Sequence, residues 1–187
     1  EVKSSFPEII FLAEVYGDYY IDLINLGFDF TYDKELLDRF RSGHMDNIRE
    51  WITKTDKYSS HLCRFIENHD DNRATEMFGY YIKRADITAL ATYTLPGMKF
   101  YFQDQWFAYK NKLDIHLRRS ASESKSEEAI EFYDKLFEIV NQDIFRNGNY
   151  TYLYPEGDTN WRLICISWKN NSTGEKLLVV VNYTAES

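Results

Sequence analysis

The 187-residue sequence predicts an α/β fold in which a four-stranded parallel sheet precedes a small antiparallel β-module. Two observations indicate this class. Four strand-like segments, each followed by helix-like ones, alternate along residues 1–147, which is typical of a parallel sheet covered by helices. Beyond Gly148 the pattern changes to strand-like segments joined by short polar turns, as in an antiparallel sheet. Four strand–helix units are half of the eight that close a (β/α)8 barrel.

The first two units are predicted from hydrophobic spacing. Residues 7–13 contain five consecutive apolar side chains, and a run that is apolar on both faces predicts a strand buried on both sides. A helical spacing follows at 18–26, with Gly27 as its stop. Aromatic and polar residues alternate at 28–32, which predicts the second strand. Helices are then expected at 34–40 and 45–54.

The remaining elements follow from the same two periods. A third strand is predicted at 62–66, a helix at 86–93, a fourth strand at 98–102 and a helix at 127–141 after a Ser-rich linker. Three antiparallel strands are predicted at 150–154, 161–168 and 177–183. We therefore divide the chain into a parallel α/β part, residues 1–147, and an antiparallel part, residues 148–187.

Composition excludes several classes of protein. With 44% hydrophobic residues the chain can bury a core, which argues against intrinsic disorder. Its 22 basic and 30 acidic residues leave a net charge of −8, whereas a nucleic-acid binder needs a basic face. The longest apolar runs are far shorter than the roughly 20 residues that cross a bilayer. We therefore expect neither a nucleic-acid partner nor a membrane span.

The two cysteines and the first residues of the chain carry further expectations. Cys63 and Cys165 lie far apart in sequence without a CxxC motif, so we expect two apolar core residues rather than a disulfide or a zinc site. The chain begins with Glu1 and has no initiating Met or signal sequence, so we expect it to be part of a longer protein whose compartment is left open.

Polar residues follow two of the predicted parallel strands, at the end where such folds gather functional groups. Glu14 comes after the first strand, and His69 and Asp70 come after the third. Two carboxylates at one edge of a sheet are what glycoside hydrolysis uses, one as a proton donor and one opposite the developing positive charge. A metal site usually needs more ligands than one His beside two Asp.

Structural explanations remain open for each of these residues. A carboxylate after an apolar strand is most often a solvated loop residue, and this reading also applies to Asp29, Asp33, Asp71 and Asp104. The His69–Asp70 pair with Asn68 and Arg73 equally fits a loop network whose hydrogen bonds are internal. Tyr16 and Trp106 are placed where sugar rings could stack on them, or they fill the core.

Three segments resemble motifs of the alpha-amylase superfamily, glycoside hydrolase family 13. Phe11-Leu12-Ala13-Glu14-Val15-Tyr16 is similar to that family's fifth-strand motif, Phe65-Ile66-Glu67-Asn68-His69-Asp70 to its seventh-strand motif, and Leu95-Pro96-Gly97-Met98-Lys99-Phe100-Tyr101-Phe102-Gln103 to its eighth-strand segment. By order, residues 27–32 would form strand six. The resemblance implies half of a (β/α)8 TIM barrel, strands 5–8, followed by the start of the family's β-domain.

The resemblance also implies a role for each candidate residue. Glu14 would be the general acid/base of a retaining hydrolase acting on alpha-glucans or oligosaccharides, and Asp70 would stabilise the transition state. His69, Asn68, Arg73, Tyr16 and Trp106 are the candidate substrate-binding residues. The family's nucleophilic aspartate lies on the fourth strand, upstream of this segment, so the isolated chain is expected to be inactive. No cofactor is implied here, and calcium only in the full-length protein.

A noncatalytic carbohydrate- or protein-binding module is the alternative function. The retained Glu14, His69 and Asp70 favour the enzyme, whereas residues 103–105, Gln-Asp-Gln, depart from the family's usual Gly-Gln/Glu pair and favour the alternative. A half barrel would also leave two strand edges unpaired, so we expect the chain either to form a homodimer through these edges or to be part of a full barrel.

Overall fold

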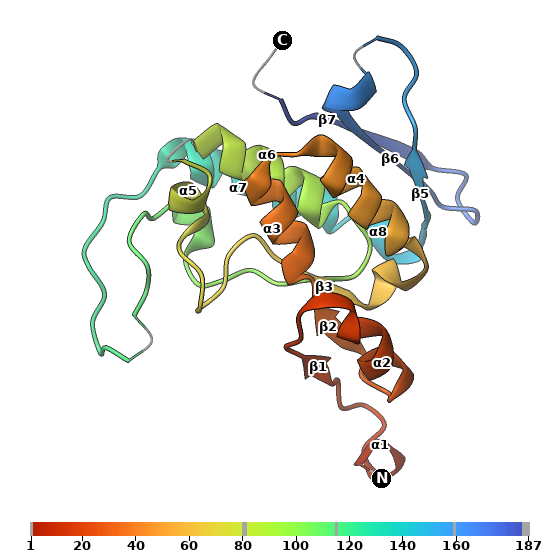
Figure 1. The fold of residues 1–187 in the computed structure, drawn as a ribbon, viewed down its shortest axis with the longest axis horizontal. Coiled ribbons are helices and arrows are strands. Elements are labelled where there is room, and N and C mark those ends of the chain that lie inside the picture. The colour runs from red at the N-terminus through yellow and green to blue at the C-terminus, as the bar shows by residue number, and fades with distance from the viewer. Residues whose placement is uncertain (1, 80–81, 115, 159, 185–187) are drawn as a thin grey trace.

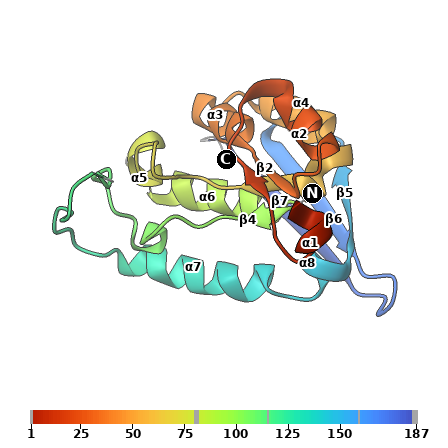
Figure 2. The same cartoon turned by 90° about the horizontal axis from the view of Figure 1, so that it is seen from below.

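A computed structural model describes residues 2–79, 82–114, 116–158 and 160–184, and it confirms the predicted α/β class. Four parallel strands form one sheet in the order β1-β2-β3-β4, and three antiparallel strands form a second sheet in the order β5-β6-β7 (Figures 1 and 2). The strands are β1 (Leu12–Ala13), β2 (Phe30–Tyr32), β3 (Leu62–Arg64), β4 (Met98–Lys99), β5 (Asn149–Leu153), β6 (Leu163–Lys169) and β7 (Lys176–Asn182).

Helices connect and cover the strands of the parallel part. The α-helices are α1 (Val2–Ser5), α2 (Tyr20–Asn25), α3 (Lys34–Ser42), α4 (Met45–Lys54), α5 (Ala74–Met77), α6 (Ile82–Tyr93), α7 (Glu127–Val140) and α8 (Ile144–Asn147), and the 3-10 turns are η1 (Gly17–Tyr19), η2 (Asp56–His61), η3 (Gln105–Phe107) and η4 (Asn160–Arg162). The sequence pattern missed the short elements α1, α5 and α8, which are too brief to show a period. A loop between η3 and α7 extends away from the body in both views (Figures 1 and 2).

The prediction that residues 7–13 form a strand buried on both sides is wrong. β1 contains Leu12 and Ala13, and in the described part of the chain it lies at the edge of the sheet and pairs with β2 alone. Ala13 is buried, but Leu12 and Ile10 are 37% and 60% exposed. An apolar run predicts burial only when another layer covers both faces, and among the described residues one face of β1 has no such cover.

Local sequence signals fix how the strands enter and leave the sheet. The side chain of Asp33 accepts a hydrogen bond from the Leu36 amide, and it thereby caps α3 directly after β2. Gly97 adopts a left-handed φ of 106° before β4, where a Cβ atom would lie 2.1 Å from the Leu62 carbonyl oxygen. Only glycine allows β4 to approach β3 this closely.

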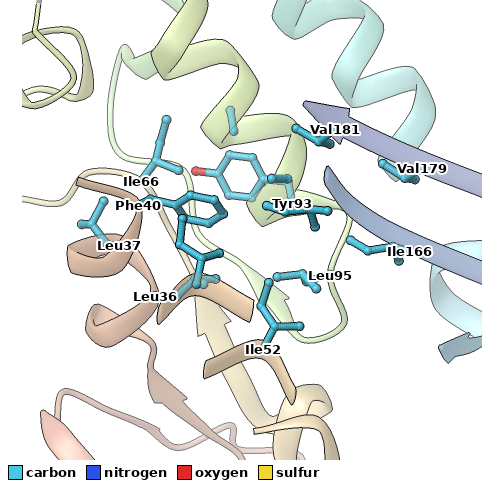
Figure 3. Packing of buried hydrophobic residues seen from close by; sticks show 14 of the residues in the cluster. Leu36, Leu37, Phe40, Ile52, Ile66, Tyr93, Leu95, Ile166, Val179 and Val181 are labelled. Carbon is cyan, nitrogen blue, oxygen red and sulfur yellow. The ribbon is translucent and has the colours of Figure 1, made fainter. Parts of the chain in front are cut away.

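One hydrophobic core joins the two sheets. Side chains of β6 and β7, such as Ile166 and Val181, face Tyr93, Leu95 and Phe40 from the parallel part (Figure 3). The Trp168 indole on β6 donates a hydrogen bond to the Thr94 carbonyl oxygen at 2.9 Å. The antiparallel sheet therefore packs on the parallel part over a shared core, and a boundary between residues 147 and 148 stays a prediction.

Two further predictions concern the burial of the cysteines and the absence of a membrane-spanning helix. Cys63 and Cys165 are both buried and unpaired, as expected of apolar core residues. Across the described ranges of the chain, none of the helices has the length and apolar character that a bilayer crossing requires.

Candidate active site

Glu14, His69 and Asp70 come together at the carboxyl ends of the parallel strands. Glu14 follows β1 directly, whereas His69 and Asp70 lie in the loop between β3 and α5. One side-chain ligand atom of each residue lies within 4.8 Å of those of the other two, and His69 Nε2 is 3.4 Å from an Asp70 carboxylate oxygen. Because parallel strands end at the same edge of a sheet, residues far apart in sequence meet here.

Tyr16 extends this cluster. Its hydroxyl donates a hydrogen bond of 2.5 Å to a carboxylate oxygen of Glu14, while its ring is 49% exposed. This hydrogen bond, followed by burial and by the charges of Glu14, Asp70 and Asp71, raises the pKa of Tyr16 to about 12. The cluster therefore carries negative charge, and the exposed ring of Tyr16 is available for contact with a ligand.

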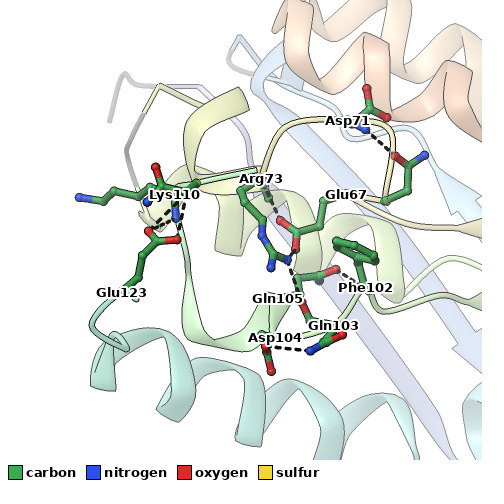
Figure 4. Close-up of polar contacts among 12 residues, drawn as sticks. Glu67, Asp71, Arg73, Phe102, Gln103, Asp104, Gln105, Lys110 and Glu123 are labelled. Carbon is green, nitrogen blue, oxygen red and sulfur yellow. Dashed lines mark hydrogen bonds and ion pairs between the residues drawn. The ribbon is translucent and has the colours of Figure 1, made fainter. Parts of the chain in front are cut away.

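Asn68 shapes the loop that carries the His–Asp pair. Its side-chain oxygen accepts hydrogen bonds from the amides of Asp70 and Asp71 at 2.9 and 2.8 Å, the second of which is drawn in Figure 4. Asn68 itself is buried, and the Asp71 carboxylate lies 3.5 Å from the ammonium of Lys34. The structure thus gives Asn68 a positioning role, and direct contact with a substrate stays a prediction.

Arg73 lies in a buried ion pair rather than beside the Glu14 cluster. Its guanidinium donates to Glu67 Oε1 at 2.7 Å and to the Gln103 carbonyl oxygen at 2.8 Å, as Figure 4 shows. The other oxygen of Glu67 accepts from the Ala74 amide at 2.6 Å, and burial raises the pKa of Glu67 despite these partners. Arg73 therefore ties the β3–α5 loop to the segment after β4, and its predicted contact with substrate is untested.

The side chains of the segment after β4 pack against the core. Trp106 lies in η3 and packs edge-on against Phe107 and Phe137, half-buried against the core. The Gln105 amide is buried and donates to the hydroxyls of Tyr93 and Tyr133 at 3.0 and 2.8 Å. Gln105 of the unusual Gln-Asp-Gln sequence thus supplies two hydrogen bonds in the core, and the stacking role predicted for Trp106 is untested.

Tyr32 is a candidate site residue that the sequence analysis missed. Its ring packs on Phe65 and Phe100, with centroids 4.9 and 6.0 Å apart, on the same face of the sheet. Burial, followed by the charges of Cys63, Glu14 and Asp70, raises the pKa of its hydroxyl. Its position at the last residue of β2, the carboxyl end of a parallel strand, is the signal that could have found it.

The loop after η3 forms a second wall beside His69 and Asp70. A pocket of about 470 Å³ is lined by these two residues together with Lys112, Asp114 and His116. The Lys112 ammonium donates to the backbone carbonyl oxygen of Asp70, and Glu123 accepts hydrogen bonds from the amides of residues 110 and 111 (Figure 4). The contact of Lys112 thus connects this loop directly to Asp70.

The donor set of the cluster does not fit calcium. Calcium takes six to eight oxygen ligands, whereas Glu14, His69 and Asp70 offer two carboxylates and one nitrogen. Two of the three side chains are also exposed. What the arrangement can do without a metal is acid–base and electrostatic chemistry, because two carboxylates and an imidazole share one surface beside a pocket.

No family model matches the sequence, and no curated protein matches it. Solved structures do. A maltogenic alpha-amylase from Thermotoga neapolitana superposes with a TM-score of 0.78 at 20% identity, covering 99% of this chain and 44% of that one. An alpha-amylase from Geobacillus thermoleovorans, solved in complex with acarbose, gives 0.79 at 20% identity, covering 100% of this chain and 44% of that one.

A third structure extends the comparison to another glycoside hydrolase. The cyclic alpha-maltosyl-(1→6)-maltose hydrolase of Arthrobacter globiformis, solved with its named sugar, gives a TM-score of 0.79 at 15% identity, covering 97% of this chain and 43% of that one. The chain thus spans less than half the length of these enzymes. Its fold is similar to that of the matching part of these enzymes, half of a TIM barrel with a following β-module.

Proposed function

We propose that this chain is the C-terminal half of the catalytic barrel of a retaining glycoside hydrolase that cleaves alpha-glucosidic bonds. The observation that carries this proposal is the convergence of Glu14, His69 and Asp70 within 4.8 Å at the carboxyl edge of the parallel sheet. The likeness to amylase structures supports the fold that this chemistry requires. Alpha-glucans or oligosaccharides are the proposed substrates.

Each residue of the cluster has a defined step in this mechanism. Glu14 donates a proton to the departing glycosidic oxygen and then removes one from the water that completes hydrolysis. Asp70 stabilises the positive charge that develops at the anomeric carbon, and His69 donates a hydrogen bond to a ring hydroxyl. The exposed Tyr16 ring supplies a stacking surface beside Glu14.

The proposed nucleophile belongs to the remainder of the longer protein. The resemblance puts this aspartate on the strand that precedes β1, and the solved structures extend beyond the part that this chain matches. Without a nucleophile the covalent route is closed, so the isolated chain would bind sugar but not turn it over.

Substitution of Glu14 in the full-length protein tests the proposal. Glu14→Gln should lower kcat for maltooligosaccharide hydrolysis by a factor of about 10²–10⁴, since it removes a general acid/base. Glu8→Gln is the matched control, because Glu8 is an exposed carboxylate that precedes β1, whereas Glu14 follows it. Hydrolysis by Glu14→Gln at the rate of the Glu8→Gln control would refute the assignment.

The assembly of the isolated chain is a separate proposal. Among the described residues, strands β1 and β4 each pair on one side only, and Ile10 before β1 and Leu12 in β1 are exposed. Unpaired edges with apolar side chains favour association of two copies. Sedimentation velocity should show a dimer at high concentration that Leu12→Lys weakens, and a monomer at all concentrations would exclude it.

A further inference from the structure

A second cavity lies at the opposite end of the parallel sheet from Glu14. It measures about 650 Å³, and its lining includes Ser60 and Gly97, which come just before β3 and β4. Arg146 of α8 and Tyr150 of β5 close its other side. The cavity therefore lies at the amino ends of the strands, where the parallel part meets the antiparallel sheet.

Lys99 brings a positive charge to this cavity. It is register-paired with Arg64 across β3 and β4, so the two side chains leave the same face of the sheet. The Arg64 guanidinium is fully buried and forms an ion pair with Asp33. The Asp33 carboxylate is thus already paired with Arg64. Within the described ranges, no carboxylate forms an ion pair with Lys99.

Two further donors line the cavity. Arg146 is exposed, and the described residues include no ion-pair partner for its guanidinium. The Tyr150 hydroxyl oxygen is buried and lacks a hydrogen-bond partner among the side chains and backbone that the structure describes. The carboxylate of Asp56 also lines the cavity but is solvent-exposed and makes no ion pair with either cation among the described residues.

The pKa of Lys99 agrees with a cavity whose positive charges lack ion-pair partners among the described residues. Burial, followed by the positive charges of Arg64 and Arg146, lowers the pKa of Lys99 to about 8. A lysine in this position is destabilised when charged, and an anion bound beside it would remove that cost.

We propose that this cavity binds a small oxyanion of the phosphate class through Lys99, Arg146 and the Tyr150 hydroxyl. An ammonium and a guanidinium supply the charge, and a tetrahedral oxyanion has enough acceptor oxygens for the phenol as well. A volume of about 650 Å³ leaves room for more than the anion itself, so the phosphate group of a small metabolite fits. This site does not depend on the chemistry proposed for Glu14.

Inorganic phosphate is the probe that tests the site. The midpoint of thermal unfolding of the 187-residue chain should rise with phosphate, compared with sodium chloride at equal ionic strength. Lys99→Met keeps a side chain of similar length and should raise the dissociation constant for phosphate by a factor of at least about ten. Arg146→Gln, at an exposed position, should weaken it too. Lys176→Met, at an exposed lysine of β7, is the matched control and should leave binding unchanged.

A direct readout separates binding at this cavity from general charge effects. The pKa of Lys99, followed by NMR after reductive methylation, should rise when phosphate is added, because a bound anion stabilises the ammonium. The charges of Arg64 and Arg146 act on Lys99, and Asp56 and Tyr150 line the same cavity. A wild-type chain that gains nothing from phosphate, or a Lys99→Met chain that gains as much as the control, would overturn the proposal.

Discussion

Asp33 and Glu14 stand at equivalent places in the chain but in opposite environments. Asp33 directly follows β2 and Glu14 directly follows β1. Asp33 is 2% exposed and accepts hydrogen bonds from the Trp51 indole at 2.8 Å and from the Arg64 guanidinium. Glu14 is exposed, and Tyr16 donates to it. The expectation that Asp33 is a solvated loop residue is therefore wrong.

The difference comes from the neighbours of the two strands. β2 lies inside the sheet, so the residue after it meets Arg64 of β3 and the helices α3 and α4. β1 lies at the edge, and Glu14 projects where the described chain leaves the surface open. A buried carboxylate keeps its charge at low cost only when it is paired. The pairing with Arg64 therefore makes Asp33 a stabilising residue, whereas the exposed Glu14 is accessible to a ligand.

Substitution of Asp33 should give the largest effect. Asp33→Asn leaves the fully buried Arg64 without its charge partner, and the free energy of unfolding should fall by about 3–5 kcal/mol, measured with chemical denaturant. Asp38→Asn, at an exposed aspartate of α3, should cost far less. Ser59→Ala, which removes only the 2.7 Å hydrogen bond from Arg64 Nη2, should lie between them. Equal losses for Asp33→Asn and Asp38→Asn would break the comparison.

Asp86 extends the comparison, because it is only 8% exposed and forms no ion pair with a cation in the part of the chain that the structure describes. Burial, followed by the charge of Glu128, raises its pKa from 3.8 to about 7. The folded state therefore binds this proton more tightly than the unfolded state. The resulting stabilisation is complete below about pH 4 and is lost as the pH rises to about 7, at up to about 1.4 kcal/mol per pH unit.

The Asp86→Asn variant isolates this contribution. Urea denaturation of both proteins from pH 4 to pH 8 should show the wild type losing stability relative to Asp86→Asn as the pH rises. Glu128→Gln should reduce the slope without removing it, because burial is the larger cause. Parallel pH profiles for wild type and Asp86→Asn would show that Asp86 titrates in the folded chain as it does in the unfolded one.

Glu14→Gln should have the smallest effect on stability and a specific effect on Tyr16. Loss of the hydrogen bond to a carboxylate, together with loss of the Glu14 charge, should lower the pKa of Tyr16 from about 12 toward its ordinary value of 10.0, while the free energy of unfolding stays nearly constant. NMR of the tyrosine ζ carbons follows this titration among the 15 tyrosines. Glu8→Gln should leave it unchanged, and an unaltered Tyr16 in Glu14→Gln would contradict the hydrogen bond.

The sequence predicted the order and type of the long elements because their periodicity is local. Helix α4 falls at the predicted residues 45–54, and the four parallel strands occur in the predicted order. The Glu14 and Asn68-His69-Asp70 motifs were visible for the same reason, since each is contiguous. Strand lengths were overestimated, because β1 and β4 stop pairing after two residues each.

Only the tertiary structure decided which polar residues face solvent. Arg73 and Asn68 read as site residues next to the His–Asp pair, yet Glu67 draws Arg73 inward and Asn68 bonds its own loop. The position of Tyr32 at the end of β2 is a weak signal, and Lys99 carries no local signal that separates it from an ordinary strand residue. Burial and charge pairing depend on which strands lie side by side, and this information is distributed over residues that are distant along the chain.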